Sequence, residues 1–483
     1  MPKCKLYLKD EVNCKFEGLD LLERRKLVEK FKFDIPHARF MPAVRLGRWD
    51  GKASFFNLGG STYTNLLGEI LPLLDSYKIE LIDYRNPIEL NFDKVTAESY
   101  SHVTWPEGHT HEGKPIVLRD YQIDVINRFL ENPQSIQEVA TGAGKTLITA
   151  ALSNVCEKYG RTIVIVPNKS LVTQTEEDYI NLGLDVGVFY GDRKEYGRTH
   201  TICTWQSLNI LTKKTRNAQV DITIEDFIEG VVCIMVDEVH MSKADVLKQL
   251  LTQQFAHVPI RWGLTGTIPK EQYEWMSLKV SIGDVVNRIA AADLQDKGVL
   301  ANCHVNIVQL NDYGEYNNYQ SELKYLLNDE GRLDYISGFI DNVKESGNTL
   351  ILVDRISAGK SLESKIDNSV FVSGSTKADE RKEHYDDVKT SDAKIIIATY
   401  GVAAVGINIP RIFNLVLLEP GKSFVRVIQS IGRGIRKAED KDFVQIWDIT
   451  STCKYAKRHL TKRKSFYREA EYPFTVEKIK WQG

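Results

Sequence analysis

The sequence predicts an α/β fold with two tandem doubly wound parallel sheets, preceded by a small α+β domain. Three observations lead to this prediction. From residue 116 onward, short β-branched runs alternate with longer helical patterns. These runs fall into two successive series. The chain before residue 116 does not show this alternation of strand and helix patterns. Continuous apolar strands separated by helices are typical of a parallel sheet that is covered on both faces.

Each series supplies a set of expected strands. Those of the first series are residues 136–139, 162–166, 201–204, 231–236 and 260–264. Those of the second series are residues 349–353, 370–372, 394–398, 414–418 and 443–449. In doubly wound sheets, ligands bind at the carboxyl ends of the strands. A Gly-rich loop, an Asp-Glu pair and a Thr-Gly-Thr sequence each directly follow a first-series strand, as that rule requires.

The beginning of the chain indicates a smaller domain of mixed structure. Asp50-Gly51 stands between the β-like runs 43–46 and 53–58, and Asp-Gly in that setting predicts a hairpin. The other expected elements are a strand at residues 3–9, a basic amphipathic helix at 20–33 and a further helix at 66–77.

The chain has 483 residues, which is enough for roughly three domains. A polar stretch rich in Gly, Pro and His separates the small domain from the first sheet and has the composition of a linker. The expected division is an N-terminal domain at residues 1–95, a linker at 96–115, sheet domains at 116–285 and 286–455, and a basic tail at 456–483.

Composition excludes several classes of protein. The chain is 42% hydrophobic and 27% charged, which is ordinary for a globular protein. It has no run of about 18 apolar residues and no secretory signal, so we expect no membrane partner and a cytoplasmic location. Seven cysteines without C-x-x-C pairs disfavour zinc. The group His102, His109 and His111 lies in the expected linker, where a solvated loop is the preferred interpretation.

The net charge is −2, but the charges are distributed unevenly. Residues 1–60 hold thirteen Lys or Arg against eight Asp or Glu, a balance of +5. Residues 454–470 hold seven Lys or Arg against one Glu. Basic ends around a more acidic middle favour contacts with nucleic acid, and plain solvated faces are the alternative.

Residues 139–146, Val-Ala-Thr-Gly-Ala-Gly-Lys-Thr, have the features of a phosphate-binding loop. Glycines let the backbone curl until its N–H groups point at a phosphate, and the following helix favours an anion at its N-terminus. The lysine neutralises phosphate oxygens, and the threonine hydroxyl can hold Mg²⁺. Position 139 is Val where a strict motif has Gly, which removes a turn glycine but not the cradle. The expected nucleotide-binding residues of this loop are Thr141, Gly142, Ala143, Gly144, Lys145 and Thr146.

An acidic pair ends the apolar strand at residues 231–236. We expect Asp237 to hold Mg²⁺ together with Thr146, and Glu238 to orient and deprotonate the attacking water. Two adjacent acids can also be merely solvated or capping groups, but the phosphate loop upstream favours the catalytic interpretation. The expected cofactors are therefore ATP and Mg²⁺.

Two arginines near the C-terminus, Arg433 and Arg436, are three residues apart and are expected on one side of a helix. The planar guanidinium group forms paired hydrogen bonds with phosphoryl oxygens, so arginine suits the spread charge of phosphoryl transfer. Because both belong to the second sheet domain, they can act as fingers across a cleft from the phosphate loop; two surface arginines are the alternative.

Together these motifs resemble the superfamily-two helicases and translocases, over roughly residues 116–450. The resemblance implies two RecA-like sheet domains with ATP between them. It implies that Arg119 and Gln122 recognise adenine, that Gly406 contacts the nucleotide, and that Gln429 joins the two arginines in catalysis. It also implies a coupling role for a further group of residues: His240, Thr265, Gly266 and Thr267. The implied contacts to nucleic-acid phosphates are Thr173, Thr204 and Thr399.

Departures from the common motifs narrow the resemblance. The acidic motif reads Asp-Glu-Val-His and the coupling motif reads Thr-Gly-Thr, and both lean away from the common RNA helicases. They are closer to the XPB, RecG and type I restriction-motor group, which acts on DNA. Residues 45–52, Arg-Leu-Gly-Arg-Trp-Asp-Gly-Lys, further resemble the phage recombination helicases.

That last resemblance implies a nucleic-acid-binding module at the N-terminus. Its basic residues Arg45, Arg48 and Lys52 would contact phosphates without reading sequence. Trp49 would stack on an unpaired base at a branch, or else fold onto its own small core.

The expected function is an ATP-dependent DNA helicase that remodels branched or forked DNA by branch migration and fork regression, in phage recombination and replication. We expect a monomer, located in the host cytoplasm if the chain is phage-encoded. Three alternatives remain: an RNA helicase of similar motor design, a translocating subunit of a restriction system, and a junction-binding protein whose motor is degenerate.

Overall fold

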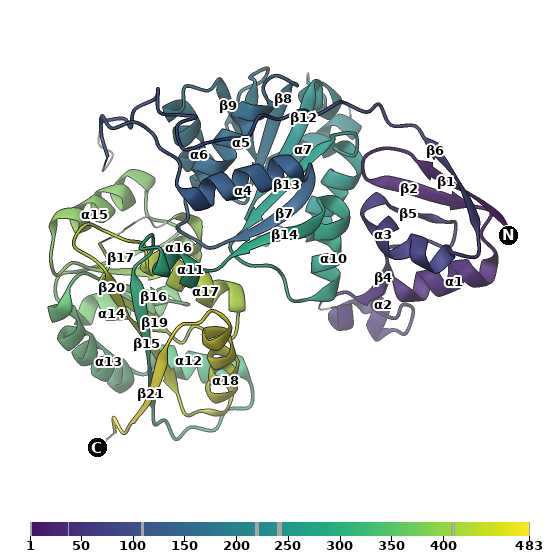
Figure 1. Ribbon diagram of the computed structural model, residues 1–483. Coiled ribbons are helices and arrows are strands. Elements are labelled where there is room, and N and C mark those ends of the chain that lie inside the picture. Colours follow the sequence, from purple (N-terminus) through teal and green to yellow (C-terminus); the bar gives the residue numbers. More distant parts are fainter. Residues whose placement is uncertain are drawn as a thin grey trace. The chain divides into compact units, whose positions relative to one another are not determined.

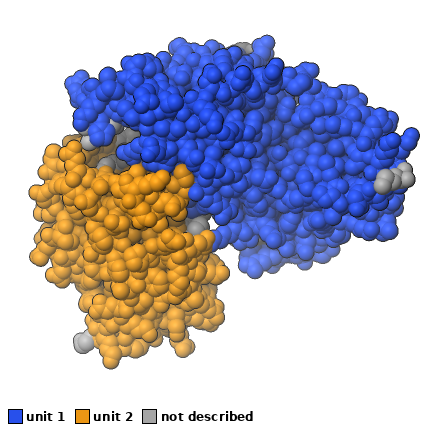
Figure 2. Space-filling view, viewed as in Figure 1, with its two compact units in different colours: residues 1–139, 144–288 blue, residues 140–143, 289–483 orange. Residues whose placement is uncertain are grey.

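The computed structural model describes residues 2–36, 38–107, 111–217, 222–238, 244–406, 409 and 411–482. The chain forms two compact units (Figures 1 and 2). Unit 1 comprises residues 1–139 and 144–288, and unit 2 comprises residues 140–143 and 289–483. Unit 1 contains the N-terminal domain and the first large sheet, and unit 2 contains the second large sheet.

The N-terminal domain is built on a small mixed sheet with the strand order β5-β2-β1-β6. Strand β1 runs antiparallel to β2 and parallel to β6. Alternate residues of β1, Cys4, Leu6 and Leu8, point into the core, as the two-residue period of a strand requires. The strands are β1 (Lys3–Leu8), β2 (Asn13–Glu17), β3 (Lys32–Asp34), β4 (Lys52–Ser54), β5 (Ser61–Tyr63) and β6 (Lys78–Asp83). The helices are α1 (Leu21–Lys30), α2 (Pro42–Arg45) and α3 (Leu67–Ile70), with 3₁₀ turns at Ala38–Phe40, Thr64–Leu66 and Leu71–Leu74.

The prediction of a hairpin formed by residues 43–46 and 53–58 is wrong. Proline at position 42 begins the short helix α2, because its fixed φ suits the first helical position. Gly51 does form a turn, with a positive φ of 78°, and the Asp50 carboxylate accepts a hydrogen bond from the Lys52 backbone N–H at 3.1 Å. The strand after this turn, β4, pairs with β3 instead.

Two expected helices of this domain are shorter in the structure. The helix expected at residues 20–33 is α1, whose N-cap Asp20 accepts a hydrogen bond from the Glu23 backbone N–H at 2.8 Å. The helix expected at residues 66–77 breaks into α3 and a following 3₁₀ turn. Pro72 explains the break, since proline lacks the N–H that a continuous helix needs.

The N-terminal domain packs against the first large sheet through α10 (Gln272–Ser281). One buried cluster contains residues from both sides of this contact: Phe16, Phe31, Phe55, Ile70, Tyr273, Met276 and Val280. Polar contacts surround it, including a hydrogen bond from the Asn65 side chain to the Lys279 carbonyl at 3.0 Å. The shared core makes the N-terminal domain part of unit 1.

The first large sheet has the order β10-β9-β11-β8-β12-β13-β7-β14. The pairings from β9 to β7 are parallel, and β10 runs antiparallel to β9 at the edge. Its strands are β7 (Gln134–Val139), β8 (Arg161–Val166), β9 (Val186–Tyr190), β10 (Arg193–Lys194), β11 (His200–Thr204), β12 (Val231–Asp237), β13 (Ile260–Thr265) and β14 (Asp284–Ile289). Its helices besides α10 are α4 (Asp120–Glu131), α5 (Lys145–Cys156), α6 (Lys169–Asn181), α7 (Trp205–Arg216), α8 (Ile224–Ile228) and α9 (Ala244–Gln249), which continues into a π-helical turn at Leu250–Gln254. All five strands expected in the first series are confirmed to within two residues at each end; β9, β10 and β14 were not expected.

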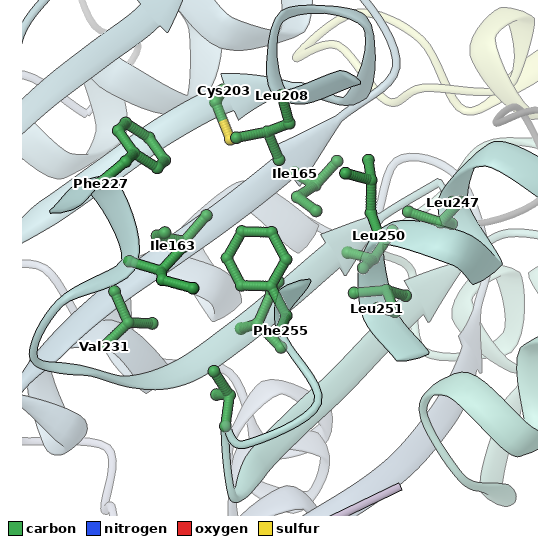
Figure 3. Packing of buried hydrophobic residues seen from close by; sticks show 14 of the residues in the cluster. Ile163, Ile165, Cys203, Leu208, Phe227, Val231, Leu247, Leu250, Leu251 and Phe255 are labelled. Atoms are coloured by element: carbon green, nitrogen blue, oxygen red, sulfur yellow. The ribbon is translucent and has the colours of Figure 1, made fainter. Parts of the chain in front are cut away.

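Helices cover both faces of this sheet. Helices α4, α5 and α6 adjoin one another on one face, and α7, α8, α9 and α10 adjoin one another on the other. On the second face, Ile163 and Ile165 of β8 pack with Leu208 of α7 and Phe227 of α8 (Figure 3). This two-sided burial explains why the strands read as continuous apolar runs in the sequence.

Arg261 of β13 is fully buried and ties several elements together. Its guanidinium donates hydrogen bonds to the carbonyls of Leu251 in the π-helical turn, of Phe255 and Val258 after that turn, and of Ser281 at the end of α10. Burial lowers the pKa of Arg261 to about 10, while Asp10 and Glu11 of the N-terminal domain oppose that shift.

The second large sheet has the order β17-β18-β16-β19-β20-β15-β21, and its described pairings are parallel. Its strands are β15 (Asn302–Leu310), β16 (Thr349–Val353), β17 (Ser369–Val372), β18 (Ile395–Thr399), β19 (Asn414–Leu418), β20 (Phe443–Ser451) and β21 (Phe474–Ile479). Its helices are α11 (Ala291–Asp296), α12 (Tyr319–Asn328), α13 (Glu330–Val343), α14 (Ile356–Lys365), α15 (Ala378–Thr390), α16 (Tyr400–Gly406), α17 (Phe424–Gly434) and α18 (Lys454–Glu469), with a 3₁₀ turn at Lys344–Ser346. The five strands of the second expected series are confirmed, and β15 and β21 were not expected.

The basic tail expected at residues 456–483 is integrated into the second sheet. Helix α18 packs on β20, and β21 pairs in parallel with β15 at the sheet edge. Arg463 of α18 is buried in a paired contact with Asp448, with both N–O distances at 2.8 Å. The other cations of α18 include exposed residues: Lys454, Lys457, Arg458, Lys462 and Arg468.

Part of the stretch expected as a linker, residues 96–115, packs against helix α5 of the first large sheet. The Tyr100 hydroxyl, in a buried side chain, donates to the Ala151 carbonyl of α5 at 3.2 Å. All seven cysteines are free and buried. Among the described residues, no helix is long and apolar enough to cross a membrane.

Candidate nucleotide-binding site

The phosphate loop lies between the carboxyl end of β7 and the start of α5, as the sequence predicts. Gly142 and Gly144 have positive φ values of 90° and 75°, which side chains rarely adopt. Gly144 is also the N-cap of α5. A Cβ atom on Gly144 would come within 2.8 Å of the Gln122 side-chain nitrogen, so a larger residue there would displace the end of that side chain as well as strain the backbone. Thr141 is half-buried and Ala143 is buried.

Lys145 is held between two strand ends of the first sheet. Its ammonium nitrogen lies 2.9 Å from Oε1 of Glu238, and it donates to the Val139 carbonyl at 3.4 Å. The side chains of Lys145 and Glu238 are both 8% exposed. The structure therefore joins the phosphate lysine and the expected catalytic glutamate, which are more than ninety residues apart in the sequence.

The acidic pair has unusual backbone and electrostatic properties. Glu238 has a positive φ of 52°, which is uncommon for a side-chain-bearing residue and is often found at functional sites. The Asp237 carboxylate accepts a hydrogen bond from the Glu238 N–H at 2.9 Å. Burial, and next the charge of Glu238, raise the pKa of Asp237 to about 7, although the Lys145 ammonium opposes this. A cation beside Asp237 would stabilise its ionised form.

The residues present fit a magnesium ion. Hydroxyl and carboxylate oxygens are ligands that Mg²⁺ accepts, usually together with substrate phosphates. Among the described residues, no group of three or more His, Cys, Asp or Glu side chains forms a metal cluster. Thr146, Asp237 and the nucleotide itself would hold a bound ion, which would neutralise phosphate charge. Thr146 and Asp237 both lie in the described part of the chain, and the structure shows no hydrogen bond between them. The Thr146 hydroxyl donates a hydrogen bond to Asp178 of α6 instead.

Asp178 is a residue of this site that the sequence analysis missed. It lies on α6, in the half-buried region beside α5. Burial raises the pKa of Asp178 to about 6, while the hydrogen bond from Thr146 works against that shift. No local pattern marked this aspartate, because its contact with Thr146 depends on how α6 packs on α5.

Gln122 is buried and positioned against the phosphate loop. Its side-chain oxygen accepts a hydrogen bond from the Arg119 backbone N–H at 3.0 Å, at the start of α4. Arg119 is exposed, and its guanidinium donates to the Tyr121 hydroxyl at 3.4 Å. The Gln122 side-chain nitrogen lies beside Gly144 of the loop, while adenine recognition by Gln122 and Arg119 stays a prediction.

The coupling motif follows β13 and contacts the acidic pair. Gly266 N–H donates to Glu238 Oε2 at 3.4 Å. The Thr265 hydroxyl donates to the Thr267 carbonyl at 2.8 Å, and this closes a tight turn. His240, expected to join this motif, lies outside the described residues.

The expected nucleic-acid contacts of the two sheets differ in exposure. Thr173 is exposed on α6. Thr204 is only 6% exposed, and its hydroxyl accepts a hydrogen bond from Ser207 N–H as the N-cap of α7. Thr399 is half-buried at the end of β18. Thr173 is therefore the best placed of the three for a phosphate contact.

In the N-terminal domain, Arg45, Arg48 and Lys52 are exposed. Trp49 is half-buried, and its indole N–H donates to the Lys52 carbonyl at 2.9 Å. Trp49 is therefore neither fully buried in a core nor fully free to stack.

In unit 2, Arg433 lies near the end of α17, and its guanidinium donates to the Ala403 carbonyl of α16. Arg436 lies beyond the last residue of α17, in a bridge with Leu300. The expectation that both arginines share one helix is therefore wrong: α17 ends between them, at Gly434. Both side chains are half-buried. Gly406 ends α16, and the side chain of Gln429 lies outside the described part of the structure.

Two family descriptions match this chain. "Type III restriction enzyme, res subunit" matches residues 115–270, which hold the phosphate loop, the acidic pair and the coupling motif. "Helicase conserved C-terminal domain" matches residues 331–438, which hold α17 and Arg433. The chain belongs to the superfamily-two helicases. Its two large parallel sheets are the two motor domains of that superfamily.

Several relatives support this assignment. The helicase is 24% identical to the ATP-dependent DNA helicase uvsW of Enterobacteria phage T4 over 465 residues, which are 91% of this chain and 89% of that protein. It is 26% identical to the putative DNA 3'-5' helicase Rad25 of Haloarcula marismortui, over 68% of this chain and 52% of that protein. The chain thus spans about half the length of this archaeal relative. This chain is an ATP-hydrolysing helicase.

One solved structure shows the same fold. A fragment of a putative HsdR subunit of a type I restriction enzyme from Vibrio vulnificus matches with a TM-score of 0.56 and 17% identity. The match covers 76% of this helicase and 69% of the fragment.

Proposed function

We propose that this helicase uses ATP and Mg²⁺ to remodel branched or forked DNA, through branch migration and fork regression, in phage recombination and replication. In this proposal Thr146 and Asp237 hold Mg·ATP beside Lys145, and Mg²⁺ neutralises phosphate charge. Glu238 orients and deprotonates the attacking water. Arg433 and Arg436 stabilise the charge of the transferred phosphoryl group.

The observation that supports a DNA-branch substrate most strongly is the surface of the N-terminal domain at residues 39–52, which we name the basic tip. Large apolar side chains are exposed there: Phe40 is 63% exposed and Leu46 is 65% exposed. Cations flank them: Arg39, Arg45, Arg48 and Lys52. Asp50 is the acidic residue of this segment, and it is neutralised by Lys32 at 2.8 Å.

This combination matches what a branch point presents. Cations bind the phosphates of any sequence. Exposed apolar side chains can enter between base steps and unstack them, which costs least where strands already separate. The guanidinium of Arg39 lies over the Phe40 ring, 4.8 Å from its centroid. A positive charge is therefore placed directly beside that apolar surface.

The name of the phage relative, a DNA helicase, and its match over nearly the whole of both chains also favour DNA over RNA. The exposed cations of α18 offer a second phosphate-binding face on unit 2. We further propose that the protein is a monomer and that it acts in the cytoplasm of the host cell if it is encoded by a phage.

A gel assay on synthetic substrates tests the proposal. A four-way junction, a simple fork and an RNA duplex are incubated with the wild-type protein, with and without ATP. We expect ATP-dependent movement of the junction and the fork, and no activity on the RNA duplex. The Lys145→Ala variant should bind the junction without moving it. Strand separation of RNA, or no movement of either DNA substrate, would contradict the proposal.

A tip variant separates branch recognition from the motor. We expect Phe40→Ala combined with Arg48→Ala to weaken junction binding about tenfold and to leave ATP turnover on saturating single-stranded DNA within about twofold. Arg128→Ala on α4 is the matched control, because it also removes an exposed arginine of unit 1. Equal junction affinity for the tip variant and the control would show that the basic tip has no part in branch binding.

A further inference from the structure

The contact between Thr146 and Asp178 joins the first turn of α5 to α6. Thr146 lies in the first turn of α5 and is the expected hydroxyl ligand of Mg²⁺. Asp178 lies on α6, the helix that also carries Thr173. The Thr146 hydroxyl donates its hydrogen bond to Oδ2 of Asp178.

This direction of donation suits a metal ligand. A threonine hydroxyl has one proton to donate and two lone pairs to offer. When its oxygen faces a cation, the proton still needs an acceptor on the other side. Asp178 is that acceptor in the structure. Partners that hold the proton of a ligand fix the orientation of the ligand, and removing them typically costs 10–100-fold in metal affinity.

Helix α6 is fastened to α5 at more than this one point. Tyr179, next to Asp178, is fully buried, and its hydroxyl donates to the Thr149 carbonyl of α5 at 3.2 Å. The same hydroxyl lies 2.5 Å from the Ser153 hydroxyl. The two helices also adjoin along their length (Figure 1). We therefore expect α6 to move as a rigid body when the first turn of α5 changes position.

The opposite side of α6 is available to a ligand. Thr173 lies five residues before Asp178, which is about 140° around the helix. Its side chain is exposed, and its hydroxyl donates to the Lys169 carbonyl one turn earlier at 3.3 Å. One face of α6 thus holds the hydroxyl of the nucleotide site, and another presents the expected phosphate contact.

We propose that Asp178 is a positioning residue that orients the Thr146 hydroxyl toward Mg²⁺ and thereby couples nucleotide binding to the nucleic-acid contacts of α6. This inference rests on the proposed function, because it takes DNA as the ligand of α6. Coupling of this kind is reciprocal: if Mg·ADP changes the affinity for DNA by some factor, DNA changes the affinity for Mg·ADP by the same factor.

Binding measurements on the full-length protein test the proposal without relying on turnover. The affinity for a fluorescent ADP is measured at several Mg²⁺ concentrations and in EDTA, each with and without an oligothymidine strand. For Asp178→Ala we expect the Mg²⁺-dependent affinity to fall about tenfold. We expect its affinity for ADP in EDTA and its affinity for DNA alone to stay within about twofold of wild type. The coupling factor between Mg·ADP and DNA should fall toward one.

Three further variants sharpen the result. Glu177→Gln removes an exposed carboxylate at the neighbouring position of α6 and should behave as wild type. Asp178→Asn keeps an oxygen that can accept the Thr146 proton, so it should recover most of the lost Mg²⁺ affinity. In a Thr146→Ala background, Asp178→Ala should cause no further loss, because Asp178 acts through that hydroxyl. Melting curves confirm that each variant is folded at the assay temperature.

The outcomes separate this inference from the proposed function. Wild-type protein without any coupling between Mg·ADP and DNA would overturn the proposed function and this inference together. Coupling in wild type that persists undiminished in folded Asp178→Ala would overturn the inference alone. A loss in Asp178→Ala that adds fully to the loss in Thr146→Ala would also overturn it, since Asp178 would then act by another route.

Discussion

At the scale of single residues, the candidate nucleotide site contains a buried ion pair, and we expect a bound phosphate to open it. Lys145 lies 2.9 Å from Glu238, and both side chains are almost inaccessible. A phosphate that takes Lys145 as its partner must compete with this carboxylate. We therefore expect the same pair to set both the affinity for nucleotide and the availability of Glu238, the proposed catalytic base.

This competition gives Glu238→Gln two opposite effects. Without the carboxylate charge, Lys145 is easier for phosphate to capture, so we expect the affinity for Mg·ADP to rise severalfold. Hydrolysis should fall by about 100-fold or more, because the general base contributes roughly 10²–10⁴. Nucleotide titration and a steady-state ATPase assay measure the two effects. An unchanged turnover would refute the role of Glu238.

Local sequence patterns found most of the charged residues of the site but not the contacts between them. Lys145 and Asp237 are recognisable because a glycine loop and an apolar strand stand directly before them. Asp178 has no such signal, and its role depends on the packing of α6 against α5. Likewise, the positive φ of Glu238 cannot be read from the letters around it.

At the scale of elements, the long apolar strands were predictable and the short elements were not. Strands such as β12 are buried on both faces, and this leaves a continuous apolar run in the sequence. The expected hairpin at residues 43–58 failed because Pro42 begins a helix. Strand β15 alternates buried and half-exposed residues in its first half, so it lacks the continuous run by which the other strands were identified.

Arg261 shows how one side chain supports several elements. Its guanidinium satisfies carbonyls in and after the π-helical turn and at the end of α10. Arg261→Met should leave these carbonyls without their donor, and we expect the free energy of unfolding to fall by about 3 kcal/mol. Chemical denaturation of the variant measures this loss. Arg198→Gln, an exposed arginine of the same unit, should change it by less than about 0.5 kcal/mol.

We expect Lys441, in the segment after α17, to make the free energy of unfolding depend on pH. Its ammonium donates to the Gly434 carbonyl at 2.7 Å, and its side chain is 1% exposed. Burial, aided by the nearby Arg436, lowers the pKa of Lys441 from 10.5 to about 7. Between these two values the unfolded chain binds more protons than the folded one, so this group makes stability rise with pH from about 7 toward 10.

Lys441→Met removes that dependence. The melting temperature of the variant relative to wild type should be highest at or below pH 7. It should decline by roughly 2–4 °C by pH 9.5. Thermal melts at several pH values measure the difference between the two proteins. A difference that stays constant across this range would contradict the assignment of this titration to Lys441.

At the scale of the whole molecule, the N-terminal domain is fixed to the first motor sheet. The shared core around Tyr273 and Met276 belongs to α10, the helix that follows the coupling motif at Thr265–Thr267. We therefore expect a change at the proposed coupling motif to be passed through α10 to the domain that carries the basic tip. The sequence predicted a separate domain but gave no indication of this shared core, because its contacts join residues more than two hundred positions apart.

The second motor sheet supplies the remaining part of the proposed mechanism. We expect Arg433 and Arg436 to reach the same nucleotide as Lys145 when the protein hydrolyses ATP. Such arginines contribute roughly 10³–10⁵ in rate. This expectation is the central claim, since it makes hydrolysis depend on both sheets.

Single-turnover hydrolysis by Arg433→Ala and Arg436→Ala, measured on saturating DNA, tests that claim most directly. We predict that both variants bind Mg·ATP within about threefold of wild type and that at least one cleaves it about 10³ times more slowly. Wild-type cleavage rates in both folded variants would show that the second sheet gives no catalytic arginine to the nucleotide bound by Lys145.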